Sequence, residues 1–162
     1  MGRESAEPLR AATIPLSLLL GLLMLTFGAL KFLNATVDGW FHVQIQQSHL
    51  PHAAILLGKL GEIATGTLFL IPRLRRLPAV DEGRLLLLAS ASLMLEMLVA
   101  VYVHLQPSVP PEVLPLGIKP PLIPVVVLLL AAMVAVPAWR DARAMSSRLP
   151  EASDDCLNAS KA

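Results

Sequence analysis

The stretch PHAAILLGKLGEIATGTLFLIP, residues 51–72, decides the fold because it is apolar and of membrane-spanning length, yet carries two charges near its middle. At about 1.5 Å per helical residue it reaches about 33 Å, enough to cross a hydrocarbon core of roughly 30 Å. Lys59 and Glu62 are three residues apart and share a helix face, where Gly58 and Gly66 leave room for a neighbouring helix. A charge at that depth costs about 2.5–3.5 kcal/mol, so we expect this face to meet protein or water rather than lipid.

The composition of the whole chain is that of a membrane protein. Of its 162 residues, 55% are hydrophobic and 15% are charged, and the mean hydropathy is +0.65. These values predict one small polytopic membrane domain. A net charge of +1 argues against nucleic-acid binding. The single cysteine, Cys156, follows the last apolar segment, so the chain cannot form an internal disulfide or carry out dithiol chemistry alone.

Four apolar stretches predict an all-α fold, a bundle of four transmembrane helices. The expected spans cover about residues 11–33, 51–72, 85–105 and 122–139. They follow a polar segment at 1–10 and precede a polar tail at 140–162, for which we expect disorder from about Ser147 onward.

Two connections on the same side of the membrane have distinctive compositions. Residues 34–50 contain no lysine or arginine, and Trp40 with Phe41 predicts an amphipathic piece at the membrane interface. Residues 106–121 contain six prolines, so we expect a stiff, extended, non-helical crossing over one end of the bundle.

The distribution of basic residues predicts the orientation. The amino-terminal segment, the connector after the second span and the tail carry two, four and four lysines or arginines, whereas the opposite side has only Lys119. Because cytoplasmic loops are enriched in these residues, we expect both termini in the cytoplasm and a multi-pass location in the cell membrane, that of a bacterial inner membrane.

The ionisable residues within the spans are the candidate functional residues. Counted from the outer helix ends at about 1.5 Å per residue, Lys59 lies about 12 Å deep and Glu96 about 13–14 Å deep. We therefore expect a polar cavity in the outer half of the bundle, with Lys59 bridging Glu62 and Glu96 and the proline-rich crossing as its lid. Lys31 and His104, near the outer ends of their spans, complete the candidates for ligand binding or proton handling.

Two competing interpretations apply to these residues. A buried ion-pair network can simply fix helix register, without any ligand. His49 and His52 have a spacing that suits joint metal ligation on a helix, but histidines in loops are more often solvated, so we expect no metal site.

Three segments resemble the DoxX-like family of small four-helix membrane proteins: GALKFL at 28–33, GKLGEIATGTLFLIP at 58–72 and HLQPSVPPEVLPLGIKPPLIP at 104–124. The resemblance covers about residues 14–137. It implies a four-helix fold and positions that correspond to Lys31, Lys59 and Glu62, for which the family offers no agreed catalytic role. The family is named for a subunit of an archaeal thiosulfate:quinone oxidoreductase, bacterial relatives are associated with membrane redox or thiol-stress complexes, and a vertebrate branch acts in receptor assembly.

We therefore expect an accessory membrane subunit that binds a small amphipathic ligand such as a quinone and supports a membrane redox or stress-response complex. Its partners would be the lipid bilayer, a membrane partner protein and, in a homo-oligomer, a second copy of the chain. We do not expect an enzyme on its own; if catalytic, the chain would be a subunit of a quinone-linked oxidoreductase. The alternatives are a small proton-coupled transporter, for which four spans without an internal repeat supply no two halves, and a structural or assembly protein without ligand chemistry.

Overall fold

The computed structural model describes residues 7–75 and 78–146, and within these ranges the regular structure is entirely helical. The long helices are α1 (Glu7–Leu33), α2 (Ala35–Gln47), α3 (Ala53–Leu74), α4 (Ala79–Leu105) and α5 (Leu122–Ser146), and two short 3₁₀ helices are η1 (Pro111–Val113) and η2 (Pro115–Gly117). Segments of α1, α3, α4 and α5 are long and apolar enough to cross a membrane. The predicted fold class is therefore confirmed.

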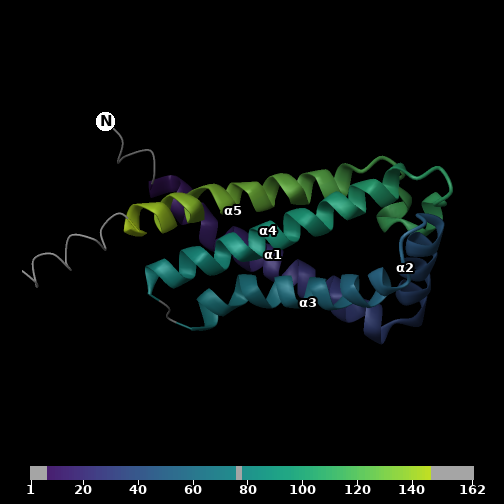
Figure 1. Cartoon of the computed structure of the whole chain (residues 1–162), viewed down its shortest axis with the longest axis horizontal. Coiled ribbons are helices and arrows are strands. Elements are labelled where there is room, and N and C mark those ends of the chain that lie inside the picture. Colours follow the sequence, from purple (N-terminus) through teal and green to yellow (C-terminus); the bar gives the residue numbers. More distant parts are fainter. Residues whose placement is uncertain (1–6, 76–77, 147–162) are drawn as a thin grey trace, which may run out of the picture.

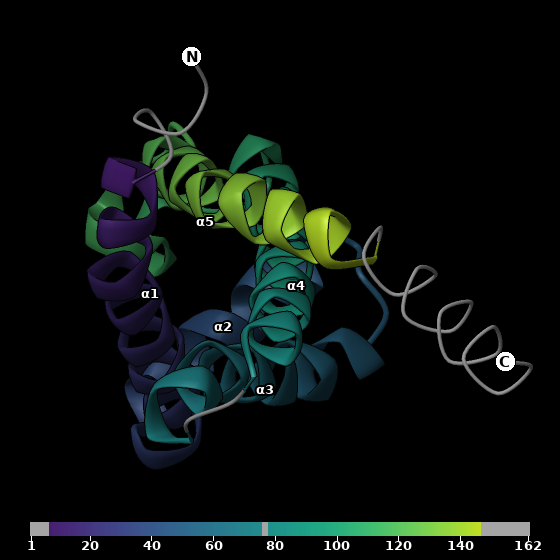
Figure 2. The ribbon, with the colours of Figure 1, turned by 90° about the vertical axis from the view of Figure 1, so that its left-hand side faces the viewer.

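The four spanning helices form a bundle, and α2 lies across one end of it (Figure 1). In the bundle α1 packs mainly on α3, α3 on α4 and α4 on α5, while α1 and α5 touch more lightly (Figure 2). We call the end that holds α2, η1 and η2 the capped end. The beginning of α1, the end of α3, the beginning of α4 and the end of α5 all lie at the opposite end (Figure 1).

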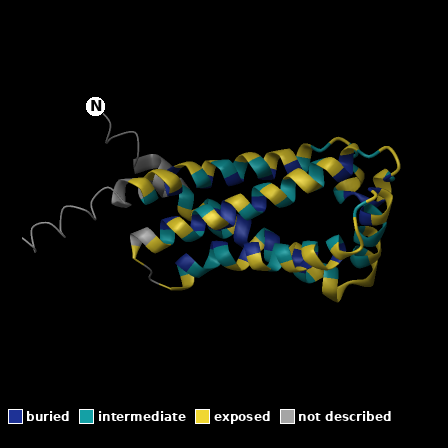
Figure 3. Cartoon of the chain, viewed as in Figure 1, coloured by how far each residue is buried: buried dark blue, intermediate teal, exposed yellow. Residues whose placement is uncertain are grey.

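The apolar core lies between the spanning helices, and most of the remaining apolar surface faces outward. Leu20, Phe69, Leu93 and Val134 are fully buried in this core. Only 28% of the most apolar window of each span is buried inside the chain, and exposed residues run along the outer faces of all four helices (Figure 3). That surface suits contact with lipid, which solvates apolar side chains well.

Close packing of α1 on α3 depends on glycine. A Cβ atom added to Gly66 would lie 2.8 Å from the carbonyl oxygen of Gly21 and from the backbone nitrogen of Leu25. A Cβ atom at Gly28 would meet Ile63 at 2.8 Å. The expectation that Gly66 leaves room for a neighbouring helix is confirmed.

The helix boundaries differ most from the prediction at the start of α4 and at the end of α5. The helix expected from residue 85 begins at Ala79, and Asp81 and Glu82 occupy its first turn, where carboxylates interact favourably with the helix dipole. The helix expected to end at residue 139 continues to Ser146, so the first seven residues of the expected polar tail are helical. The expected disorder from Ser147 and the position of Cys156 lie outside the described residues.

The proline-rich crossing was predicted to be extended and non-helical, but it is folded and partly helical. It forms η1 and η2, and the second turn closes through positive φ angles of 57° at Leu116 and 67° at Gly117. Lys119 donates hydrogen bonds back to the carbonyl oxygens of Gln106 and Val109, which gives the segment a folded shape instead of an extended one. Three-residue 3₁₀ turns tolerate proline at their first positions because the missing N–H has no partner there.

Candidate functional site

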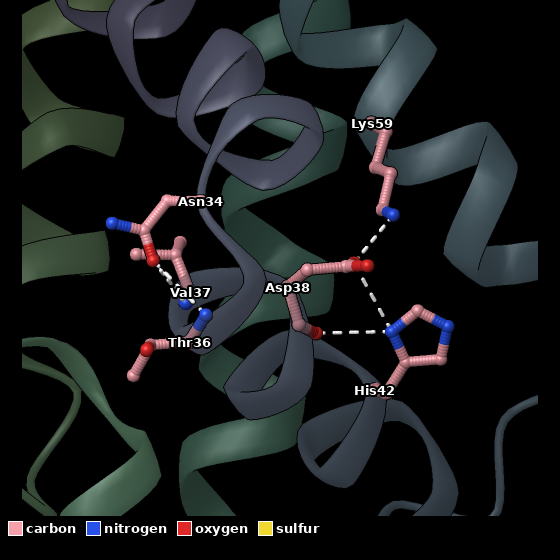
Figure 4. Close-up of polar contacts among 6 residues, drawn as sticks. All are labelled: Asn34, Thr36, Val37, Asp38, His42 and Lys59. Carbon is pink, nitrogen blue, oxygen red and sulfur yellow. Dashed lines mark hydrogen bonds and ion pairs between the residues drawn. The ribbon is translucent and has the colours of Figure 1, made fainter.

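The chain turns from α1 into α2 at Asn34, which positions the first polar residue of the site. The side-chain oxygen of Asn34 accepts hydrogen bonds from the backbone nitrogens of Thr36, at 3.0 Å, and Val37, at 3.2 Å (Figure 4). This is an N-cap, and it places Asp38 in the first turn of α2. Asp38 thereby faces the end of the bundle.

Two basic side chains, Lys59 and His42, lie against the carboxylate of Asp38 (Figure 4). Lys59 of α3 forms an ion pair with its carboxylate, and Nδ1 of His42 lies 3.1 Å from the same oxygen and 2.9 Å from the Asp38 carbonyl oxygen. The hydrogen bond from Lys59 holds the pKa of the Asp38 carboxyl below its usual value against the cost of desolvation, and the charge of Lys59 and the proximity of His42 act in the same direction. Because Lys59 is only 8% exposed, Asp38 is the group that compensates a buried ammonium.

A second ion pair joins α1 to α3. Lys31 donates to Oε1 of Glu62, and the two side chains are 12% and 15% exposed. The Lys31 ammonium also lies 3.8 Å from the centroid of the Phe41 ring, which belongs to α2. Gly58 makes room for that ring, since a Cβ atom there would lie 2.8 Å from it. Phe41 therefore points into the site, whereas Trp40 beside it is 45% exposed.

These pairs correct the predicted arrangement in which Lys59 bridges Glu62 and Glu96. The Cα–Cβ bond tilts toward the amino terminus of its helix. Helix α3 begins at the capped end, so Lys59 leans toward α2 and reaches Asp38. Helix α1 runs in the other direction, so Lys31 leans into the bundle and meets Glu62.

The predicted lid is corrected as well, because α2 rather than the proline-rich crossing contacts the charged residues. The proline-rich crossing instead forms hydrogen bonds with α2. Gln44 donates to the carbonyl oxygen of Val113, Ser108 donates to that of Gln47, and the Tyr102 hydroxyl of α4 donates to that of Ser48 at 3.2 Å. The cover of the site is thus a helix fixed by side-chain bonds to η1 and α4.

The carboxylate of Glu96, on α4, is bound by hydroxyl groups of α3 and α4. Thr65 donates to its Oε1 at 2.7 Å, and Ser92 lies 2.7 Å from the Thr65 hydroxyl and 3.5 Å from Oε1. Since Thr65 gives its single proton to Glu96, Ser92 is the donor to Thr65. Gly61 admits the carboxylate, because a Cβ atom there would lie 3.1 Å from Glu96 Oε1.

One oxygen of each buried glutamate has no hydrogen-bond partner among the described residues. These atoms are Oε2 of Glu62 and Oε2 of Glu96. The cluster Asp38, Glu62 and Glu96 with Lys31 and Lys59 would carry a net charge of −1 if every group were ionised. The ion pairs join Lys31 to Glu62 and Lys59 to Asp38, and Glu96 forms no ion pair within the described residues.

The structure does not join the histidine candidates to this cluster. His104 is buried, and Nδ1 of its ring is 2.8 Å from the carbonyl oxygen of Ala100 in the preceding turn of α4. His49, with a φ of 57°, and His52 are exposed at the α2–α3 turn. No group of three or more metal-ligating side chains is found within residues 7–75 and 78–146.

Sequence reasoning missed Asp38, Phe41 and Thr65 as members of the site. Asp38 had a readable signal, because it is the only carboxylate in residues 34–50 and lies beside the span that contains Lys59. Thr65 lies three residues after Glu62, on the face already singled out. Phe41 had no signal that separates it from Trp40.

Comparisons of the chain with protein-family models, with curated proteins and with solved structures find no match.

Proposed function

We propose that this chain is an accessory membrane subunit, not an enzyme on its own, that binds the polar headgroup of a small amphipathic molecule at the cluster under α2. A quinone is the ligand class we favour, and the complex it supports would be a membrane redox or stress-response complex. The resemblance of residues 14–137 to the DoxX-like family supports this choice of class.

The observation that carries the proposal is the pair of free carboxylate oxygens, Glu62 Oε2 and Glu96 Oε2. A buried polar atom without a partner costs about 1–3 kcal/mol, and more when the group is charged. A ligand that reaches both oxygens removes that cost, so binding energy is available at this place.

The surroundings also suit an amphipathic molecule. Within a few residues of the cluster, the outer faces of α3 and α4 carry exposed apolar side chains, among them Leu57, Leu60, Leu95 and Leu98. A headgroup among the carboxylates and a tail along these faces would satisfy both environments. Binding then requires a displacement of α2 or of the side chains beneath it, because both free oxygens are shielded from solvent.

The orientation belongs to the same proposal. With ten lysines and arginines on the side of the termini, the capped end faces away from the cytoplasm, and the ligand enters from the outer leaflet of a bacterial inner membrane. A partner protein would contact the outer faces of the bundle within the bilayer.

Organic extraction and mass spectrometry of the purified protein in lipid nanodiscs test this function. Glu96→Leu removes both carboxylate oxygens at nearly constant size, and Thr65 and Ser92 can still bond to each other across 2.7 Å. We expect wild type to retain a quinone above the level of bulk lipid and Glu96→Leu to lose it. Glu112→Leu changes an exposed carboxylate at the same end and is the matched control.

The thermal unfolding of each variant is recorded beside the extraction. Equal quinone content in folded wild type and folded Glu96→Leu would overturn the proposal, as would a wild type that carries bulk lipid alone.

A further inference from the structure

We propose that the outer face of α5, at the end of the bundle opposite α2, binds an anionic phospholipid. Arg140 and Arg143 would hold the phosphate of its headgroup, and its acyl chains would lie along the apolar part of the same face. The partner is a lipid with net negative charge, of which phosphatidylglycerol is the simplest. This surface is separate from the cluster under α2, and the inference holds whichever side of the membrane it faces.

The two arginines continue a row of exposed apolar side chains on α5, which we call the α5 stripe. Exposed residues follow one another at intervals of four, three, four and three: Leu129, Met133, Val136, Arg140 and Arg143. This spacing keeps all five on one side of an α-helix. A lipid whose chains lie along the apolar part of the stripe therefore has its headgroup beside the two guanidinium groups.

The depth of the arginines also suits a phosphate. The apolar span of α5 ends at Arg140, and Arg143 follows three residues later, about 4.5 Å further along the axis. Because the Cα–Cβ bonds of a helix tilt toward its amino terminus, both side chains lean back toward the apolar span. They are thus directed to the boundary between hydrocarbon and headgroups and not away from the membrane.

Both guanidinium groups are available to a ligand. Neither forms an ion pair in the part of the chain that the structure describes. Arg143 lies over the ring of Trp139, 3.9 Å from its centroid, which leaves the N–H donors at the edge of the guanidinium free to bind phosphate. Arg73 at the same end differs, because it is paired with Glu82 at 2.8 Å.

Helix α4, which packs on α5, repeats the pattern. It begins at the end of the bundle where α5 ends (Figure 1). Arg84 is exposed, forms no ion pair within the described residues, and precedes Leu88, Leu95 and Leu98 on the same side of the helix. The exposed Asp81, one turn earlier, offsets part of its charge. Unpaired positive charge at the ends of two lipid-facing surfaces favours a net-negative lipid over a zwitterionic one.

The test measures which lipid the full-length protein retains. The protein is reconstituted in vesicles of equal parts phosphatidylglycerol and phosphatidylcholine with identical acyl chains and extracted in detergent, and the co-purified lipids are quantified by mass spectrometry. One arginine near an anionic headgroup contributes a factor of about five. We expect wild type to enrich phosphatidylglycerol about 25-fold, Arg140→Gln and Arg143→Gln about fivefold each, and the double variant not at all.

Two variants and one soluble competitor serve as controls. Arg140→Lys keeps the charge and should keep most of the enrichment. Arg75→Gln removes an exposed arginine at the same end, but from the extended residue that follows α3, so the enrichment should not change. Glycerophosphoglycerol carries the headgroup without acyl chains and should not displace the lipid. Thermal unfolding shows that each variant is folded, and the single variants suffice if the double variant is not.

Equal retention of the two lipids by wild type would overturn this inference, as would an enrichment that persists in folded Arg140→Gln and Arg143→Gln. An equal loss in Arg75→Gln would overturn it too, because the attraction would then follow the net charge and not the α5 stripe. Displacement by glycerophosphoglycerol would show that the apolar part of the stripe contributes nothing.

Discussion

Lys59 of α3 forms its ion pair with Asp38 of α2, so a lysine near the middle of a membrane span is tied to the helix that covers the capped end. The pair is asymmetric in exposure, since the side chain of Lys59 is 10% exposed and that of Asp38 is 34% exposed. Loss of the carboxylate would leave a nearly buried ammonium without compensation. The charge of Asp38 is therefore one of the contacts that hold α2 on the bundle, beside its side-chain bonds to η1 and α4.

The first prediction concerns pH. The hydrogen bond from Lys59 lowers the pKa of Asp38 in the folded protein, whereas a free aspartate titrates at about 3.9. A carboxyl with a depressed folded-state pKa contributes stability above its unfolded pKa, and that contribution is lost as pH falls through the folded value. We expect α2 to stay docked from pH 7 to about 4 and to undock below that, as measured by the fluorescence of Trp40 in a Trp139→Phe background.

Asp38→Asn is the control for this titration. Its α2 should show faster amide hydrogen exchange at pH 7, while the exchange of α4 stays as in wild type. A low-pH transition of the same size in Asp38→Asn would mean that another group is responsible.

The second prediction concerns the hydroxyl chain at Glu96. Thr65 is fully buried and donates to the carboxylate, so Thr65→Val keeps the shape but removes the donor. We expect a loss of about 1–2 kcal/mol in the free energy of unfolding, measured by denaturant titration in detergent. Thr67→Val is the matched control, because Thr67 is exposed and donates only to the Ile63 carbonyl oxygen of its own helix. Equal losses in the two variants would contradict the importance of the Thr65 contact.

The fold could be predicted from the sequence because length and hydropathy alone determine which segments can cross a membrane. The segment 51–72, for example, corresponds to α3 with a shift of two residues at each end. The pairing of the charges could not be predicted in the same way. Lys59 and Glu62 share a face of α3, but the direction in which a long side chain leans depends on where its helix begins relative to its neighbours. The place of α2 across the bundle end was therefore needed to assign a partner to each lysine.

The polar contacts of Thr65 and Ser92 show the same limit. Hydroxyl groups in membrane helices commonly bond to their own backbone, as Thr67 does. Only the approach of α4 to Gly61 brings a carboxylate within reach of Thr65. No spacing within one helix contains that information.

The third prediction concerns the close approach of α1 and α3. In Gly66→Ala the added Cβ atom would lie 2.8 Å from backbone atoms of Gly21 and Leu25, so the helices must separate. We expect a destabilisation of about 1–3 kcal/mol in thermal or denaturant unfolding. Gly39→Ala in α2 meets no atom within 4 Å and should be neutral or stabilising by up to about 1 kcal/mol through helix propensity. A neutral Gly66→Ala would show that the two helices can move apart freely.

The last prediction concerns orientation, on which the entry of the proposed ligand depends. In a Cys156→Ser background, a cysteine at Glu112 reports on the capped end and a cysteine at Arg84 reports on the opposite end, since both residues are exposed. If the basic residues keep their side in the cytoplasm, a membrane-impermeant maleimide should label Glu112→Cys in intact cells, and Arg84→Cys only after the cells are opened. The reverse pattern would place the cluster under α2 near the cytoplasmic leaflet, and a ligand would then have to reach Glu62 and Glu96 from inside the cell.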